Sequence, residues 1–122
     1  MDKRMSRRFA LALDLVDDAK LIAEYEEWHR PGRTPEPIIR SILESGIENM
    51  EIYRAGNRMF MIIEAGDSYS PEAKGRADAA NPDVQRWVAR MKRFQQPVPA
   101  ADPDGTWIEM DRVFRLTDHS DR

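Results

Sequence analysis

The sequence predicts an α+β fold of the ferredoxin-like type, a βαββαβ antiparallel sheet like that of dimeric α/β barrels. Strand-like and helix-like stretches follow one another in that order, with each helical region split in two. A turn-forming sequence joins two strand-like stretches in the middle of the chain. The length of 122 residues fits one domain, taken as residues 1–122 with an ordered core of about residues 6–117.

The first strand and the first helix are predicted from hydrophobic periodicity. Residues 8–16 form the strand, because apolar and small or polar side chains alternate there. A helix over about residues 18–29 follows, in which Asp17 and Asp18 provide a cap and first-turn negative charge. Its apolar residues recur at helical spacing: Leu21, Ile22, Tyr25 and Trp28. A Pro- and Gly-rich loop begins at Pro31, two residues after His29.

The middle of the chain predicts a short helix and a β-hairpin. The helix is marked by Ile38, Ile39, Ile42 and Leu43. Gly46 ends this helix, and strands over residues 47–54 and 58–65 then flank an Ala-Gly-Asn turn. The second strand is nearly all apolar, which is typical of a central strand.

Two further helices and a closing strand are predicted in the last part of the chain. A short Ala-rich helix over residues 71–80 is followed by a longer one that Asn81-Pro82 begins and Pro97 stops. The apolar stripe of the longer helix comprises Val84, Trp87, Val88, Met91 and Phe94. Residues 107–116 are predicted as the last strand, and the tail from Thr117 is expected to fray.

The predicted architecture also implies a homodimer. Helices on one face of a four-stranded antiparallel sheet leave the other face in need of cover. Two protomers provide that cover mutually when their sheets pack together.

Composition excludes several function classes. A net charge of −3 argues against nucleic acid as a partner, because phosphate binding needs clustered Lys and Arg. The absence of cysteine excludes disulfides, thiolate nucleophiles and Cys-based metal sites. No apolar run is long enough for a membrane span and no signal peptide is evident, so we expect a cytoplasmic protein. No metal site and no cofactor are expected, and a small neutral ligand suits this composition.

His29 is the candidate acid–base residue, since the other histidine, His119, lies in the polar tail. A structural alternative is that His29 merely stabilises the helix C-terminus. The functional interpretation is favoured by Tyr25, which lies four residues earlier and therefore on the same helical face. Trp87 likewise has a structural and a functional interpretation, as a residue of the helix core or as an aromatic wall of a ligand site.

Three segments together resemble one known family. They are Tyr25-Glu26-Glu27-Trp28-His29-Arg30-Pro31, Gly46-Ile47-Glu48-Asn49-Met50-Glu51-Ile52-Tyr53 and Asn81-Pro82-Asp83-Val84-Gln85-Arg86-Trp87. Their order and spacing resemble the L-rhamnose mutarotase family and its L-fucose mutarotase-like branch over nearly the whole chain.

The resemblance implies a cofactor-free homodimer that interconverts the α and β anomers of a 6-deoxy-L-hexose. It implies that His29 is the proton donor and that Tyr25 contacts the sugar. Trp87 matches the first of two adjacent sugar-binding tryptophans, and Val88 replaces the second. Met50 occupies the position of a sugar-contacting tyrosine.

The loop after His29 indicates which branch of the family the chain resembles. Rhamnose-type members have a short stretch ending in Trp-Pro-Glu, whereas this chain has the longer Arg-Pro-Gly-Arg-Thr-Pro-Glu-Pro over residues 30–37. The longer form resembles the L-fucose mutarotase-like branch, so L-fucose is the expected substrate.

Interconversion of the anomers needs an acid and a base. The sequence does not identify the base, and the candidates are Glu24, Glu27 and Glu109. Two other functions also stay open. One is a cofactor-free monooxygenase or isomerase on the same dimeric fold, and the other is a non-enzymatic sugar-binding module.

Overall fold

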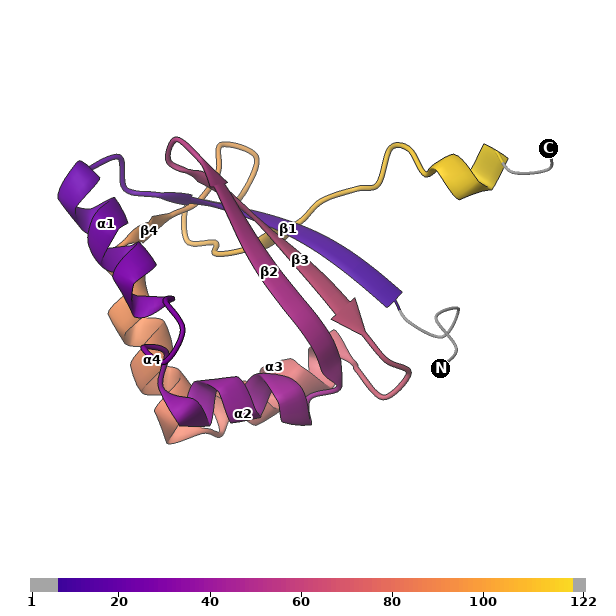
Figure 1. Ribbon diagram of the computed structural model, residues 1–122, viewed down its shortest axis with the longest axis horizontal. Coiled ribbons are helices and arrows are strands. Elements are labelled where there is room, and N and C mark those ends of the chain that lie inside the picture. Colours follow the sequence, from indigo (N-terminus) through magenta and orange to yellow (C-terminus); the bar gives the residue numbers. More distant parts are fainter. Residues whose placement is uncertain (1–6, 120–122) are drawn as a thin grey trace.

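A computed structural model describes residues 7–119 of the chain. Figure 1 shows the strands on one side of the molecule, with the helices α1 to α4 gathered along the other. The elements in chain order are β1 (Arg7–Leu15), α1 (Ala19–Trp28), α2 (Glu36–Glu44), β2 (Ile47–Ala55), β3 (Arg58–Ala65), α3 (Pro71–Ala79), α4 (Pro82–Lys92), β4 (Gln95–Gln96), β5 (Ile108–Glu109) and the 3-10 helix η2 (Leu116–His119).

The sheet has the strand order β2-β3-β1-β4, and β5 also pairs with β1. Every pair is antiparallel. The predicted α+β fold with an antiparallel sheet is therefore confirmed. The nearly all-apolar β3 lies between β2 and β1, as its composition predicts.

A β-bulge interrupts the pairing of β2 with β3. Ile47 lies opposite Ala65 and Asn49 lies opposite Glu64, so Glu48 is the extra residue. Side chains alternate between the two faces of a strand, and the extra residue resets this alternation. As a result Ile47, Met50 and Ile52 all face the helices, together with Ile63 and Met61 of β3.

The helix boundaries follow from capping residues. Asp18 Oδ1 accepts hydrogen bonds from the backbone N–H groups of Lys20 at 2.9 Å and Leu21 at 3.0 Å, which begins α1. Asn81 caps α4 in the same way. Gly46 ends the α2 segment with a φ of +98°, a conformation that favours glycine.

The core lies between the sheet and the helices. Its largest fully buried side chains, each less than 2% exposed, are Leu13, Leu15, Met59 and Phe94. Tyr25 from α1 and Met91 from α4 pack into the same cluster. The core therefore fixes α1 and α4 directly on the sheet.

The prediction of a strand over residues 107–116 is wrong for most of its length. Only Ile108 and Glu109 pair with β1, followed by one hydrogen bond from Met110 N to Ala10 O at 2.7 Å. Val113 is 95% exposed and Phe114 64%, so the alternation in this segment has no packed surface behind it within the described residues. Figure 1 shows the segment extending away from the sheet.

The other edge position on β1 is taken by Gln95 and Gln96, which pair with Leu15 and Asp14. This two-residue strand was not predicted, because two glutamines carry no strand pattern. The predicted ordered core begins at residue 6, which lies outside the described residues. None of the helices formed by residues 7–119 is long and apolar enough to cross a bilayer.

Candidate active site

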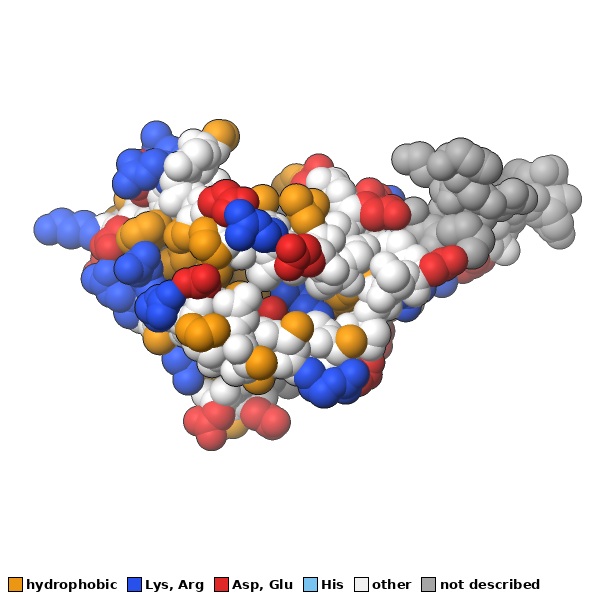
Figure 2. Space-filling view, turned by 90° about the horizontal axis from the view of Figure 1, so that it is seen from below, with side chains coloured by type: hydrophobic (Ala, Val, Ile, Leu, Met, Phe, Trp, Pro, Cys, Tyr) orange, Lys and Arg blue, Asp and Glu red, His pale blue; other side chains and the backbone are white. Residues whose placement is uncertain are grey.

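A cavity of about 740 Å³ opens on the helix side of the sheet. It is lined by side chains of the helices, of β2 and β3, and of the segments that follow α1 and α4. In the view of Figure 2 the molecule is hollowed near its middle, with apolar and charged side chains around the hollow. The structure brings all the predicted site residues to this cavity: Tyr25, His29, Met50, Trp87 and Val88. Their roles stay a prediction.

His29 lies at the C-terminal cap of α1, where Pro31 prevents the helix from continuing. Its Nδ1 lies 2.7 Å from the carbonyl oxygen of Tyr25. A carbonyl only accepts hydrogen bonds, so Nδ1 carries the proton, and in the neutral ring Nε2 has the free lone pair. Among residues 7–119, Nε2 has no hydrogen-bond partner.

The ionisation of His29 is shifted by its surroundings. Burial lowers the pKa of His29 below its ordinary value of 6.5, and the hydrogen bond with the Tyr25 carbonyl opposes this effect. At neutral pH the imidazole is therefore uncharged. An uncharged imidazole with a free Nε2 is a base as well as a latent acid.

Aromatic side chains surround the imidazole. The Tyr25 ring lies 4.3 Å from it and the Trp87 ring 5.6 Å, measured between centroids. Trp28 contacts Trp87 edge-to-face at 6.0 Å and packs on the core. Trp87 packs on that core and also lines the cavity, so its two interpretations are compatible.

Tyr25 stays protonated throughout the physiological range. Burial raises its pKa to about 12, and a hydrogen bond with the Gln95 side chain opposes the shift. Gln95 lies on the short strand β4 and lines the cavity. The sequence did not single out this residue.

Met50 on β2 and Val88 on α4 both line the cavity. Met50 faces inward, opposite Ile63 of β3, and packs against the cluster around Ile63. Val88 is 42% exposed. Both give the cavity apolar surface.

The three carboxylates considered as bases do not line the cavity. Glu24 pairs with Arg93 at 2.7 Å, and Glu27 pairs with Arg33 at 2.7 Å. Glu109 is exposed on β5.

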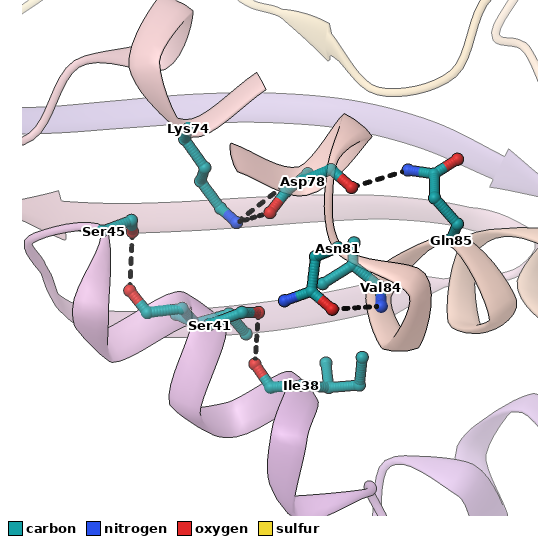
Figure 3. Close-up of polar contacts among 9 residues, drawn as sticks. Ile38, Ser41, Ser45, Lys74, Asp78, Asn81, Val84 and Gln85 are labelled. Atoms are coloured by element: carbon teal, nitrogen blue, oxygen red, sulfur yellow. Dashed lines mark hydrogen bonds and ion pairs between the residues drawn. The ribbon is translucent and has the colours of Figure 1, made fainter. Parts of the chain in front are cut away.

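Two other carboxylates, Glu26 and Asp78, reach the cavity, each paired with a cation that also lines it. Glu26 pairs with Arg54 at 2.7 Å and Asp78 with Lys74 at 2.9 Å. Figure 3 shows Lys74 meeting Asp78 beside α2, which carries Ser41. The i, i+4 spacing of Lys74 and Asp78 was the signal available in the sequence, but it is common on solvated helices.

The cavity thus combines a neutral base, aromatic walls and paired charges. Aromatic rings suit the C–H faces of a sugar, and the polar groups suit its hydroxyls. Among residues 7–119, no three His, Cys, Asp or Glu side chains gather as metal ligands would. That the reaction needs no cofactor stays a prediction.

Comparison with known proteins gives a family and a fold. The family model for L-rhamnose mutarotase matches residues 8–116. An L-fucose mutarotase of Xanthomonas campestris pv. campestris is 42% identical over 112 residues, which cover 92% of this chain and 90% of that protein.

Two solved structures share the fold. The L-rhamnose mutarotase of Formosa agariphila has a TM-score of 0.63 at 21% identity, over 89% of this chain and 97% of that one. The tetracenomycin F2 cyclase of Streptomyces glaucescens, a type-II polyketide cyclase, has a TM-score of 0.53 at 17% identity over the same shares. At these identities the likeness shows the fold alone.

Proposed function

The chain belongs to the L-rhamnose mutarotase family and is an isomerase of the L-fucose/L-rhamnose mutarotase type, and on that premise we propose that it interconverts the anomers of L-fucose with His29 as the acid–base group. The observation that carries the proposal is the hydrogen bond from His29 Nδ1 to the Tyr25 carbonyl, because it leaves Nε2 basic on a residue that lines the cavity.

The preference for L-fucose has two supports. The 42% identical relative is an L-fucose mutarotase. In addition, Met50 and Val88 stand where the rhamnose-type pattern has a tyrosine and a tryptophan, and both line the cavity. A cavity that differs at these two positions presents a different surface to the sugar.

His29 serves both proton transfers of the reaction. Nε2 takes the proton of the anomeric hydroxyl, and the electron pair left on that oxygen forms the carbonyl as the bond from C1 to the ring oxygen breaks. The same nitrogen then donates the proton to the ring oxygen, which matches the predicted role of proton donor. Rotation about C1–C2 and the reverse steps give the other anomer, with no net gain or loss of protons.

One nitrogen suffices because both reacting oxygens are bonded to C1. The hydrogen bond between Nδ1 and the Tyr25 carbonyl holds the ring orientation throughout. It also stabilises the imidazolium that exists between the two transfers.

Tyr25 and Trp87 hold the sugar beside His29. The neutral Tyr25 phenol supplies a hydroxyl that donates or accepts a hydrogen bond, and the Trp87 ring supplies an apolar surface. The ring contacts of both residues with His29 bring a bound sugar close to Nε2.

The test is His29→Gln, measured by saturation-transfer NMR of anomeric exchange in equilibrated L-fucose. Glutamine keeps a polar side chain but neither accepts nor releases a proton at neutral pH, so kcat should fall on the order of 10²–10⁴-fold. The far-UV circular dichroism should not change.

His119→Gln is the matched control, since it removes the other histidine of the chain from the exposed η2 segment. It should leave exchange unchanged. Full activity in His29→Gln would refute the acid–base role. Sugar binding without accelerated exchange in the wild-type protein would favour the binding module instead.

We further propose that two copies pair through the sheet face opposite the helices. Ala10, Phe60 and Ile62 point to that face and are only partly buried in the single chain. Sheet-to-sheet packing would cover them. The expected cytoplasmic location likewise stays a proposal.

A further inference from the structure

The inward side of α3 consists of two charged residues. All nine residues of α3 are described, and the two that are not exposed are Lys74 and Asp78. A helix packed on a protein body normally turns an apolar stripe inward. Here Lys74 Nζ contacts both carboxylate oxygens of Asp78, at 3.0 and 2.9 Å, and both residues line the cavity.

Stability does not explain this arrangement. The two side chains are 18% and 28% exposed, so forming the pair removes charge from water. Desolvation opposes the attraction within such pairs, and apolar residues of similar size serve helix packing as well or better. An inward Lys and Asp on α3 therefore point to a ligand.

The pair has unused hydrogen-bonding capacity on the cavity side. A carboxylate offers about four acceptor sites and an ammonium three N–H donors. Among residues 7–119, the two side chains hydrogen-bond only each other. Ser41 also lines the cavity, and its hydroxyl, which donates to Ile38 O at 2.8 Å, still accepts (Figure 3).

The spare groups match the hydroxyls of a neutral sugar. A sugar hydroxyl donates to a carboxylate and accepts from an ammonium, and a neutral ligand leaves the charge balance of the pair intact. In the proposed mechanism His29 interacts with the anomeric and ring oxygens. The hydroxyls on C2, C3 or C4 are therefore left for a second structural element, such as α3, to bind. L-Fucose and L-rhamnose differ in configuration at C2 and C4.

We propose that Lys74 and Asp78 clamp the ring hydroxyls of the sugar and determine which 6-deoxyhexose is accepted. The inference rests on the proposed mutarotase function. Lys74 and Asp78 are thus specificity-determining residues, while His29 performs the proton transfers.

The test uses Lys74→Met, which keeps most of the stem, and Asp78→Asn, which keeps the shape. A hydrogen bond to a charged group is worth enough that KM for L-fucose should rise on the order of 10- to 100-fold. We expect kcat to change much less, and the preference for L-fucose over L-rhamnose to shrink. Both are measured by anomeric-exchange NMR.

Glu36→Gln and Arg40→Met form the matched control. This pair has the same i, i+4 spacing on α2, but its side chains are 67% and 57% exposed and do not line the cavity. The control variants should keep the wild-type KM and sugar preference. If they changed KM as much as the α3 variants do, a general effect of charge would replace the clamp.

Deoxy sugars identify the contacted hydroxyl. Asp78→Asn should raise KM for L-fucose but not for the 2-deoxy, 3-deoxy or 4-deoxy analogue that already lacks the hydroxyl bound by Asp78. An equal effect on every analogue would overturn the proposal. So would a wild-type KM and preference in both α3 variants.

Two measurements distinguish a role of Lys74 and Asp78 in sugar binding from a role in folding and from the proposed catalysis. The double variant Lys74→Met/Asp78→Leu should keep or raise the thermal unfolding midpoint, whereas a structural pair would lower it. If the wild type accelerates no exchange, the proposed function fails. Binding of L-fucose, followed by NMR titration, then still decides whether the α3 variants lose a ligand.

Discussion

In the proposed mechanism, the hydrogen bond between His29 Nδ1 and the Tyr25 carbonyl decides which proton transfer comes first. It places the proton of the neutral ring on Nδ1, so Nε2 begins as a base and becomes an acid only after it has taken a proton. Sequence spacing placed Tyr25 and His29 on one helical face. It did not identify the tautomer, because the backbone oxygen that sets it is available at every helix end.

The pH profile of wild-type exchange should follow His29. Since burial lowers the pKa of His29 below 6.5, the midpoint of the acidic decline in kcat/KM should lie below pH 6.5. Exchange measured by NMR at a series of pH values checks the prediction. A midpoint above pH 6.5 would contradict it.

The pH dependence of folding stability should also reflect the ionisation of His29. Below pH 6.5 the unfolded chain binds a proton at His29 before the folded chain does, so the free energy of unfolding should fall as pH falls towards the folded pKa. His29→Gln should lose that component. Denaturant unfolding at several pH values measures it.

At the scale of single elements, capping and turn residues made the boundaries predictable. Asp18, Asn81 and Gly46 act through local hydrogen bonds and backbone conformation, which depend on nearby sequence. The closing strand was predicted too long because alternation in residues 107–116 does not show that the segment packs on the sheet, and Val113 and Phe114 are exposed. The edge of β1 is shared between β4 and β5, and neither pairing was visible in the sequence.

Two glycines should respond in opposite ways to substitution by alanine. At Gly46 a Cβ would lie 2.6 Å from Ser68 Oγ and 3.0 Å from Tyr69 N, at a φ of +98°. Gly46→Ala should therefore lower the free energy of unfolding by about 1–3 kcal/mol. Gly75 lies in α3 with no atom within 4 Å of an added Cβ.

Gly75→Ala is the matched comparison, and it should raise stability by about 0.5–1 kcal/mol because alanine favours a helix. Urea unfolding measures both variants. Equal effects of the two substitutions would show that backbone conformation at Gly46 is unimportant. Gly75→Ala should leave exchange unchanged, since the residue does not line the cavity.

At the scale of the whole molecule, the order of elements was predictable because each strand and helix carries its own periodicity. The cavity was not, because it depends on how α1, α2, α3 and α4 sit over the sheet. Lys74 and Asp78 show the difference: their spacing is visible in the sequence, but their inward direction follows from the position of α3. Gln95 likewise enters the site only through its pairing with β1.

The proposed dimer gives a prediction at this scale. Sedimentation velocity at micromolar concentration should show a particle of twice the chain mass, and Ile62→Glu should dissociate it by placing a charge in the sheet interface. Asp67→Lys changes the charge of the β3–α3 connection and is the control. A wild-type monomer would exclude the sheet-to-sheet arrangement.

The domain assignment can be tested with the same protein. One domain should unfold in a single cooperative transition, with equal calorimetric and van't Hoff enthalpies. Two separate transitions would contradict the single-domain prediction.

The bulge at Glu48 makes β2 more tolerant of the loss of one residue than of the gain of one. Deleting Glu48 would leave Ile47, Asn49 and Met50 in plain alternation, so Met50 and Ile52 would keep their inward direction. Inserting a residue between Met50 and Ile52 would instead reverse every side chain beyond it and carry Tyr53 inward. Relatives one residue shorter here can therefore keep the same cavity wall, whereas a relative with one more residue inside the strand would need a second irregularity to restore it.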